Sequence, residues 1–427
     1  MAQAHLVSAI DVADFGAETL RVGDLNGDGA PDLLFVQSKF GTREITCLTA
    51  TTLHGERLWQ CGAADADNGR VYSDLPVQVY DWDGDGANEV LYIEQASYAE
   101  LYDPRAQIVE RAKRYEGEAA LVVLDAATAR QKARIPLPAP ADDCFLFADL
   151  TGSGRRRDFV VKDRYWNMWG VSAAGQVLWH WEGSTGHFPA YGDVDGDGRD
   201  EVFVGYTLID HDGSVLFERP AQGGHQDAAY IVRLPDGSPR LLFGNHGIHC
   251  LSVDGSELWH HPLAEAQHVV AGRFCPEVGP VQVAVIDRGQ PRPEGGRDPA
   301  TLYMYDLDGP ELWRRVQPEG SGLAACIELN WSGDTRSQEL LVYNRGAGRP
   351  AAIYDGSGAI VQTLAMQYPS SRRQADADAQ HYVTRADVWG DRRDEVIFFG
   401  SRGACVWANS RPLSVPTLYN NTLYPGM

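Results

Sequence analysis

The sequence is poor in positive charge. Its 37 Lys and Arg residues stand against 59 Asp and Glu residues, which gives a formal net charge of −22 at pH 7. Nucleic-acid binding depends on a basic surface that neutralises phosphates, and attachment to anionic lipid depends on a polybasic segment. We therefore expect neither a nucleic acid nor a membrane as a partner.

Long apolar runs are also missing. No stretch approaches the roughly 18 apolar residues that a membrane-spanning helix needs. Residues 1–6 have neither the basic nor the apolar region of a secretory signal. The seven cysteines are odd in number and scattered, which is typical of reduced, buried thiols. These features predict a cytoplasmic protein.

Long helical periodicity and compact catalytic motifs are absent as well. The chain contains no Gly-rich phosphate loop, nucleophile elbow or metalloprotease motif. Apolar residues make up 44% of the sequence, enough for a substantial core. Residues 94–115 interrupt the pattern and are expected to be partly helical or a lid-like loop, and residues 290–299 read as a surface loop. Neither insertion indicates a domain boundary.

What the chain has instead is a repeated acidic loop. Its best copy is Asp-Val-Asp-Gly-Asp-Gly-Arg-Asp-Glu at 193–201, and two more copies lie at 24–32 and 81–89. Alternating carboxylates with a turn-forming Gly suit calcium, which takes six to eight oxygen ligands. The predicted calcium ligands are Asp24, Asn26, Asp28, Asp32, Asp81, Asp83, Asp85, Glu89, Asp193, Asp195, Asp197 and Glu201. Since loops in separate units cannot all surround one active site, most of these calcium ions are expected to brace turns.

The loops belong to a longer repeat. A second signature, Gly-x-x-Leu followed by an aromatic residue, marks the other half of each unit, and Asp often precedes its Gly. Asp-Gly between β runs is a strong hairpin signal. Weaker acidic loops lie at 149–154, 328–334 and 387–395, and the second signature lies at 55–59, 175–179, 213–217, 255–259 and 309–313. About eight such units predict an all-β, eight-bladed β-propeller of four-stranded antiparallel blades, formed by residues 1–427 as one domain; seven blades is the alternative.

Histidines recur where the innermost strands are expected to begin. His187 and His381 each stand six residues before the first Asp of an acidic loop, and His225 and His268 hold the matching places in units without one. Innermost strands line the channel of a propeller, so these side chains are expected to ring one mouth. Other units have Glu18, Asp74 or Asp143 at or near this place. A single such His is more often structural, but four suit acid–base chemistry or anion recognition.

Three further groups are candidates. Residues 162–169, with Arg164, Tyr165 and Trp166, mix a cation, a phenol and indoles, which suits a sugar; the alternative is an amphipathic strand with Trp in the core. Arg288 and Arg345 end corresponding strands and are expected at the channel mouth. A zinc site at His246, His249 and Cys250 is also considered, although its spacing is a weak signal.

The run 186–202, followed by Gly205, 210–213 and 223–228, resembles rhamnogalacturonan lyases, and residues 420–424 are similar to the end of such chains. The resemblance implies a calcium-containing eight-bladed propeller that cleaves a uronate-containing, rhamnose-containing glycan by β-elimination. Propeller enzymes acting on ulvan and on rhamnose–glucuronate linkages are similar in having a His-rich mouth.

β-Elimination requires that the uronate carboxylate be neutralised, that a base remove the C5 proton, and that the leaving O4 be protonated. The resemblance implies Arg164 or His381 for the carboxylate, His225 or His187 as the base and Tyr165 as the donor. Substrate contacts are expected from His268, His381, Trp166, Arg288 and Arg345. The expected partner is a uronate-containing oligosaccharide or polysaccharide, and the chain is expected to be a monomer or a small homo-oligomer.

Two other functions remain open on the sequence. A rhamnosidase-like glycoside hydrolase on the same scaffold would use two carboxylates, for which Glu18, Asp74 and Asp143 are candidates. A non-catalytic propeller would use its calcium loops only to brace a surface that binds glycan or protein.

Overall fold

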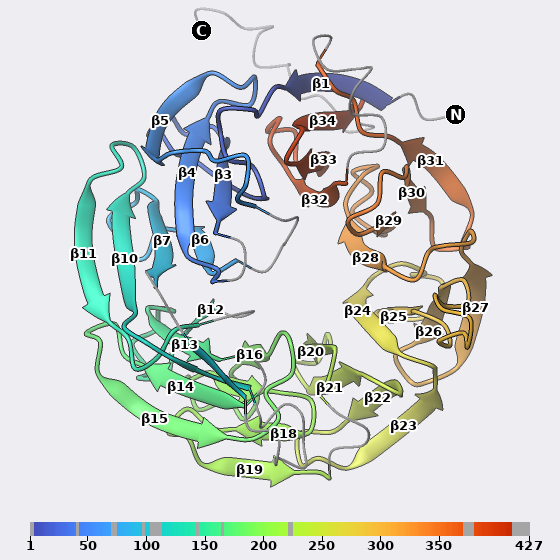
Figure 1. Ribbon diagram of the computed structural model, residues 1–427. Helices are drawn as coiled ribbons and strands as arrows, with labels where there is room; N and C mark the ends of the chain where they lie inside the picture. Colours follow the sequence, from blue (N-terminus) through green and yellow to red (C-terminus); the bar gives the residue numbers. More distant parts are fainter. Residues whose placement is uncertain are drawn as a thin grey trace, which may run out of the picture.

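The protein forms a ring of eight β-sheets (Figure 1). The computed structural model describes residues 4–39, 42–69, 75–95, 99–102, 113–141, 145–163, 166–220, 225–369 and 380–411. Within these ranges there is no helix, and the strands make eight four-stranded antiparallel sheets and one two-stranded hairpin. The predicted eight-bladed propeller is confirmed, and the seven-bladed alternative is wrong.

The first four blades follow the chain from β2, each running from its innermost to its outermost strand. Blade 1 contains β2 (Thr19–Gly23), β3 (Asp32–Ser38), β4 (Ile45–Thr51) and β5 (Arg57–Gly62). Blade 2 contains β6 (Val77–Tyr80), β7 (Glu89–Glu94), β10 (Ala120–Asp125) and β11 (Gln131–Pro136). Blade 3 contains β12 (Phe145–Ala148), β13 (Asp158–Lys162), β14 (Asn167–Val171) and β15 (Val177–Glu182). Blade 4 contains β16 (Ala190–Gly192), β17 (Glu201–Phe203), β18 (Thr207–Ile209) and β19 (Val215–Glu218).

The other four blades complete the ring. Blade 5 contains β20 (Ala228–Arg233), β21 (Pro239–Gly244), β22 (Gly247–Leu251) and β23 (Glu257–Pro262). Blade 6 contains β24 (Ala266–Gly272), β25 (Gln282–Asp287), β26 (Thr301–Asp306) and β27 (Glu311–Val316). Blade 7 contains β28 (Ala324–Leu329), β29 (Glu339–Asn344), β30 (Ala351–Tyr354) and β31 (Ile360–Leu364). Blade 8 contains β32 (Tyr382–Ala386), β33 (Glu395–Gly400), β34 (Gly403–Asn409) and, outermost, β1 (Ala4–Ile10).

The two ends of the described chain meet in blade 8. Strand β1 pairs antiparallel with β34, from Ala4 opposite Asn409 to Ile10 opposite Ala404. The ring is therefore closed by hydrogen bonds between its first and last strands, and Ile10 is buried in the core between blades 8 and 1.

Apolar contacts between neighbouring blades form the core. The second strand of a blade is covered on both faces, so every residue of β3, β25 and β33 is buried, as continuous apolar runs predict. The outermost strands β11 and β23 instead alternate between exposed and partly buried residues. Removal of these apolar faces from water is the main force that holds the blades together.

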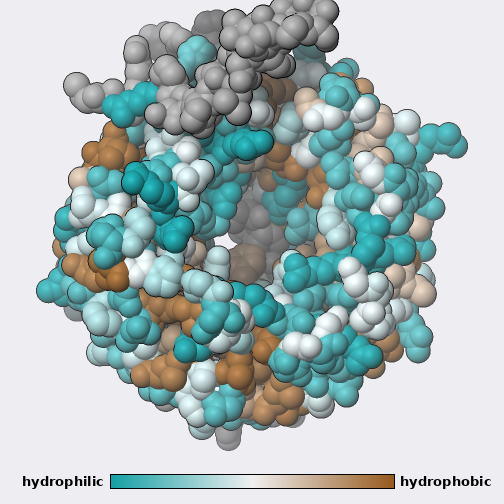
Figure 2. All heavy atoms as spheres, turned by 180° about the vertical axis from the view of Figure 1, so that it is seen from behind, coloured by the Kyte–Doolittle hydropathy of each residue, from teal (hydrophilic) through white to brown (hydrophobic). Residues whose placement is uncertain are grey.

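Antiparallel pairing places two kinds of loop at opposite ends of the ring. Each innermost strand begins at one end, which we call the histidine end, and finishes at the other, which we call the acidic-loop end. The loops 24–31, 81–88 and 193–200 follow innermost strands, so they lie at the acidic-loop end together with the Asp-Gly turns. Seen from behind, the ring is hollowed at its centre (Figure 2).

The insertion after β7 begins and ends as a hairpin. Strands β8 (Ala99–Tyr102) and β9 (Lys113–Glu116) pair antiparallel, and residues 103–112 between them lie outside the described residues. Residues 290–299 form a mostly exposed loop with a bridge between Pro291 and Arg297, as predicted. In the described part of the chain, no helix is long and apolar enough to cross a membrane. The six cysteines of that part are free thiols, and five of them are buried.

Candidate active site at the histidine end

Two of the predicted histidines meet across blades 4 and 5. His187 and His225, which precede β16 and β20, have ring centroids 4.9 Å apart in an edge-to-face arrangement. Their Nε2 atoms lie 4.0 Å and 3.9 Å from the same oxygen, Oδ1 of Asp227. The backbone N–H of His187 donates to the carbonyl of Gln226 at 3.2 Å, which fixes the two strand entries to each other. The structure thus builds a His–Asp–His group.

Asp227 is the member of this group that the sequence reasoning did not select. Its carboxylate is buried, and Oδ1 accepts a hydrogen bond from Nε2 of Gln267 at 3.0 Å. Burial raises the pKa of Asp227, while the positive charges available at His225 and His187 act in the opposite direction. Asp227 is therefore a buried acidic group that both imidazoles face.

Gln267 joins this group to a set of cations in blade 6. Nη1 of Arg288 donates to Oε1 of Gln267 at 2.6 Å and to Oε1 of Glu265 at 2.8 Å, and Nε donates to the carbonyl of Gly322 at 2.8 Å. Arg297 forms a further ion pair with Glu265. Arg288 is thus held by three acceptors, and Gln267 transmits its position to Asp227.

His268 and Arg345 complete the electrostatic environment. Burial first, and then the charges of Arg345, His187 and Arg288, lower the pKa of His268 well below its usual value, so its imidazole is neutral at pH 7. Nε2 of His268 and Nε of Arg345 are buried, and neither has a hydrogen-bond partner among the described residues. Buried polar atoms are normally paired, so these two unsatisfied atoms mark this part of the histidine end as a candidate for polar contacts.

His381 begins an innermost strand as predicted, but its imidazole serves a different place. Its Nε2 lies 3.1 Å from the carbonyl oxygen of Arg349, and its ring packs on the edge of Phe398 with centroids 5.3 Å apart. With Met366 and Tyr368 it lines a cavity of about 360 Å³ that lies between blades 7 and 8. The structure therefore brings together His187, His225, His268, Arg288 and Arg345, and places His381 elsewhere on the same end.

The aromatic run 162–169 is tied to a buried turn. The carboxylate of Asp163 accepts the backbone N–H groups of Trp166 and Asn167 at 3.0 and 2.6 Å, and Trp166 is partly buried. Met168 is buried and Trp169 stacks on His180, so this half of the run matches the alternative of a core-packed strand. Arg164 and Tyr165 lie outside the described residues.

The residues considered for zinc are separated. Neighbouring residues of a strand point to opposite faces, so His249 and Cys250 of β22 cannot share a metal. Cys250 lies in the apolar core between blades 5 and 6, where burial raises the pKa of its thiol to about 12. The ring of His249 stacks between Phe243 and His260, while Nδ1 of His246 lies 3.3 Å from the carbonyl oxygen of Ala264.

The carboxylates considered for a hydrolase have structural or undescribed positions. Glu18 is buried, and its Oε2 accepts hydrogen bonds from the backbone N–H and the hydroxyl of Ser38 at 2.7 and 2.8 Å. This carboxylate holds the end of β3. Asp74 and Asp143 lie outside the described residues.

The acidic loops differ in how well they fit calcium. In blade 4, ligand atoms of Asp193, Asp195 and Asp197 lie within 4.8 Å of one another. Oε2 of Glu201 accepts the N–H of Val194 at 2.6 Å, while its Oε1 is buried and has no partner among the described residues. Burial raises the pKa of Glu201 to about 8. This oxygen set, with its orphaned carboxylate atom, fits a hard cation.

The loop of blade 1 is folded in the same way. Asp24 accepts the N–H groups of Gly27 and Gly29 at 2.7 and 2.9 Å, and Asp32 accepts that of Leu25 at 3.1 Å. Oδ1 of Asn26 accepts the N–H of Asp28 at 2.8 Å, and Nδ2 of Asn26 donates to Oδ2 of Asp28 at 3.0 Å. In blade 2, however, a lysine side chain lies among the carboxylates of Asp83, Asp85 and Glu89.

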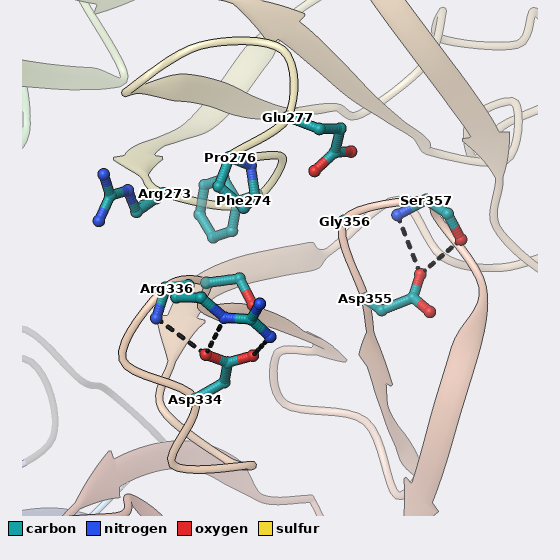
Figure 3. A pocket seen from close by; sticks show the side chains of 10 residues that line it. Arg273, Phe274, Pro276, Glu277, Asp334, Arg336, Asp355, Gly356 and Ser357 are labelled. Atoms are coloured by element: carbon teal, nitrogen blue, oxygen red, sulfur yellow. Dashed lines mark hydrogen bonds and ion pairs between the residues drawn. The ribbon is translucent and has the colours of Figure 1, made fainter.

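A larger cavity lies at the acidic-loop end, between blades 6 and 7. It has a volume of about 640 Å³ and is lined by loop 273–277, turn 334–337 and turn 355–357 (Figure 3). Nη2 of Arg336 donates to Asp334 at 2.9 Å, and Asp355 accepts from the backbone and the hydroxyl of Ser357. Asp334, Arg336 and Asp355 thus stabilise their own turns, whereas the histidine end gathers groups suited to acid–base chemistry.

No family model matches the sequence. Rhamnogalacturonan endolyase YesW of Bacillus subtilis is 24% identical over 449 residues, which cover 90% of this chain and 66% of that protein. Rhamnogalacturonan exolyase YesX of the same organism is 23% identical over 444 residues, which cover 90% of this chain and 69% of that protein. The homologues of this chain are rhamnogalacturonan lyases. The resemblance predicted from the sequence is thereby confirmed, and the chain spans about two thirds of the length of these curated relatives.

Solved structures agree on the fold. The crystal structure of the exotype rhamnogalacturonan lyase YesX matches with a TM-score of 0.64 and 20% identity, covering 93% of this chain and 72% of that chain. The Vibrio cholerae biofilm matrix protein Bap1 matches with a TM-score of 0.65 and 14% identity, covering 96% and 92%. At these identities the structural likeness establishes the propeller alone.

Proposed function

We propose that this chain is a polysaccharide lyase that cleaves a rhamnogalacturonan-like glycan by β-elimination at a uronate residue. The homology to rhamnogalacturonan lyases supports the substrate class. The observation that carries the proposal is the pair His187 and His225 beside one buried carboxylate, Asp227. A buried Asp stabilises the imidazolium that forms when a neutral histidine accepts a proton, and so raises its power as a base.

In the proposed reaction one imidazole of the pair takes the C5 proton of the uronate. The C5–H electron pair forms the C4–C5 double bond, the C4–O4 bond breaks, and O4 leaves with a proton from a general acid. His225 and His187 are almost equidistant from Asp227. We therefore propose that one of the two is the base and that the other lies beside it as the second imidazole of the pair. Tyr165 remains the proposed proton donor.

Negative charge that develops on the uronate carboxylate must be stabilised by a cation. Of the two predicted arginines, Arg288 is already held by Glu265 and Gln267, whereas Nε of Arg345 has no partner among the described residues. We therefore assign carboxylate binding to Arg345 in preference to Arg164 or His381. His268, which is neutral, and Trp166 are proposed to contact the sugar rings.

We also propose that the loops of blades 1 and 4 bind calcium. Asp24, Asn26, Asp28 and Asp32 would hold one ion, and Asp193, Asp195, Asp197 and Glu201 another. The ions would hold turns of the acidic-loop end in place, because these loops follow the innermost strands β2 and β16, whereas His187 and His225 precede β16 and β20 at the other end.

The test is turnover of rhamnogalacturonan oligosaccharides by the wild type, H187A and H225A. A lyase leaves an unsaturated uronate that absorbs ultraviolet light, so absorbance and product mass are followed together. We expect at least one histidine variant to lose 10²-fold or more in kcat while staying folded, as removal of a general base does. His54→Ala, an exposed histidine of the acidic-loop end, is the matched control.

Three outcomes would overturn the proposal. Cleavage to saturated products would indicate a hydrolase. Binding of the glycan without turnover would indicate a binding propeller, and wild-type rates in both histidine variants would remove the pair from the chemistry.

A further inference from the structure

The acidic loop of blade 2 contains a positively charged side chain where the loop of blade 4 has an unsatisfied carboxylate. Nζ of Lys132 lies 2.5 Å from Oδ2 of Asp83, 3.3 Å from Oδ2 of Asp85 and 2.7 Å from Oε1 of Glu89. These three residues belong to the set that the sequence assigns to calcium. One ammonium thus contacts the oxygens that would surround the metal.

The two loops are otherwise built alike. Oε2 of Glu89 accepts the N–H of Trp82 at 2.8 Å, just as Oε2 of Glu201 accepts that of Val194 at 2.6 Å. The other oxygen differs, because Oε1 of Glu89 accepts from Lys132 while Oε1 of Glu201 is buried without a partner among the described residues. The loop of blade 2 is therefore satisfied by the protein itself.

The position of Lys132 is set by a bulge that recurs around the ring. In the pairing of β10 with β11, Val123 is opposite Ala133 and Leu124 is opposite Gln131, so Lys132 is the extra residue. The fourth strands of six other blades carry the same irregularity. Their extra residues are Leu58, Leu178, Leu216, Leu258, Leu312 and Val361. A bulge aims its extra side chain away from the regular ladder, and only in blade 2 among these seven is that side chain charged.

A second cation covers the same loop. Nη2 of Arg155, from the equivalent loop of blade 3, donates to the carbonyl of Asp81 at 3.2 Å and lies 3.7 Å from its Oδ2. The guanidinium lies directly over Gly84, where a Cβ atom would be 1.5 Å from Nη1. In blade 4, Arg199 and His211 each form an ion pair at 3.7 Å with the loop carboxylate of Asp197. The two cations at the loop of blade 2 thus contact all four of its carboxylates, Asp81 through Arg155 and the other three through Lys132.

We infer that the ammonium of Lys132 replaces calcium in blade 2, so that this loop stays folded without metal while the loops of blades 1 and 4 depend on it. A cation entering the loop would have to displace the ammonium from three carboxylates and would meet its repulsion. Calcium ligands must be free oxygens, and here those of Asp83, Asp85 and Glu89 are occupied. The inference concerns metal binding and does not depend on lyase activity, although it uses the proposal that such loops bind calcium.

The test counts calcium ions in the full-length chain. Wild type, Lys132→Leu and Leu216→Lys are freed of metal with a chelator, dialysed and titrated with calcium chloride by calorimetry, and bound calcium is then measured by elemental analysis. Lys132→Leu introduces the residue that most other blades have at the bulge, and we expect it to bind one calcium more than the wild type. Leu216→Lys supplies an ammonium to blade 4, and we expect it to bind one calcium fewer.

Arg134→Leu is the matched control. Arg134 is a cation of the same strand, but its side chain pairs with Glu94, which lies outside the loop. Its calcium count should equal that of the wild type. Equal counts in Lys132→Leu and the wild type, including zero in both, would overturn the inference. If the wild type binds no calcium and Lys132→Leu binds one ion, the inference about blade 2 is supported. The same result would refute calcium binding by the loops of blades 1 and 4. If Lys132→Leu does not fold even with calcium, Leu216→Lys decides by the same count.

Discussion

Replacement of Asp227 by Asn tests the central electrostatic argument with the smallest change in shape. Asn keeps a carbonyl oxygen that can accept the hydrogen bond of Gln267, now 3.0 Å long, but it has no charge. The imidazoles of His187 and His225 would stay in place. What disappears is the anion that stabilises an imidazolium formed at either of them.

The magnitude follows from the distances. Two unit charges about 4 Å apart interact by about 4 kcal/mol at an effective dielectric constant of about 20, which suits groups that are mostly buried. The pairs here are separated by 3.9 and 4.0 Å. Since each 1.36 kcal/mol changes a rate tenfold, we expect Asp227→Asn to lower kcat by up to about 10³-fold. KM should change little, because the proposed contact that binds the uronate carboxylate comes from Arg345 and not from Asp227.

The assay is the appearance of unsaturated uronate from rhamnogalacturonan oligosaccharides, with folding checked by circular dichroism. Asp236→Asn is the matched control, because Asp236 lies in the same blade at the acidic-loop end and accepts its two turn hydrogen bonds through an oxygen that Asn retains. If Asp227→Asn keeps a kcat within about threefold of the wild type, the carboxylate does not support the base and the mechanism must be rebuilt.

Three further predictions concern stability. The pKa of His268 is lowered in the folded state, so below about pH 6.5 the folded protein binds fewer protons than the unfolded chain. The free energy of unfolding should therefore fall on acidification, and it should fall less in His268→Gln. Urea titrations at pH 7 and pH 5 measure this, and an equal loss of stability in the two proteins would contradict it. Deletion of residues 1–10 exposes the edge of β34 and removes Ile10 from the core, which costs about 1.5–3 kcal/mol for that side chain alone. The truncated protein should have a lower melting temperature and should self-associate through the exposed strand edge, as gel filtration would show. An equally stable monomer would refute the argument that β1 closes the ring. Chelation should lower the melting temperature while leaving kcat of the still-folded protein unchanged, and a kcat that falls before unfolding begins would place a metal in the chemistry.

The repeat was visible in the sequence because it has a physical period. Acidic loops, Asp-Gly turns and short apolar runs each fix one part of a blade, so their recurrence predicts blade number and strand order. The same register located His187, His225 and His268, since residues at one position of successive blades must lie at one end of the channel. Asp227 was within reach of the same reasoning, because it stands two residues after His225 at a strand entry.

Side-chain direction was not predictable in this way. His381 has the right register, but a strand entry lies outside the hydrogen-bonded ladder, and there the carbonyl of Arg349 and the ring of Phe398 orient the imidazole. The zinc hypothesis was wrong because of regular strand geometry. His249 and Cys250 are neighbours in β22, so their side chains point to opposite faces of the sheet. Sequence spacing finds positions along a strand, while tertiary contacts decide which of those positions share a site.

Lys132 shows how a repeat can change chemistry without changing shape. Strand β11 has the same bulge as the fourth strands of other blades, so the backbone of blade 2 is unchanged. A lysine at the bulge position is enough to place a positive charge among the loop carboxylates. Histidine chemistry at one end of the ring and the loop cations at the other are separated by the length of an innermost strand, roughly 10 Å for the three residues of β16 and roughly 20 Å for the six of β20. Both lengths exceed the screening length of about 8 Å at physiological salt. Gain or loss of calcium by the exposed loops should therefore change the field at His187 and His225 only weakly, which leaves each blade free to use metal or lysine.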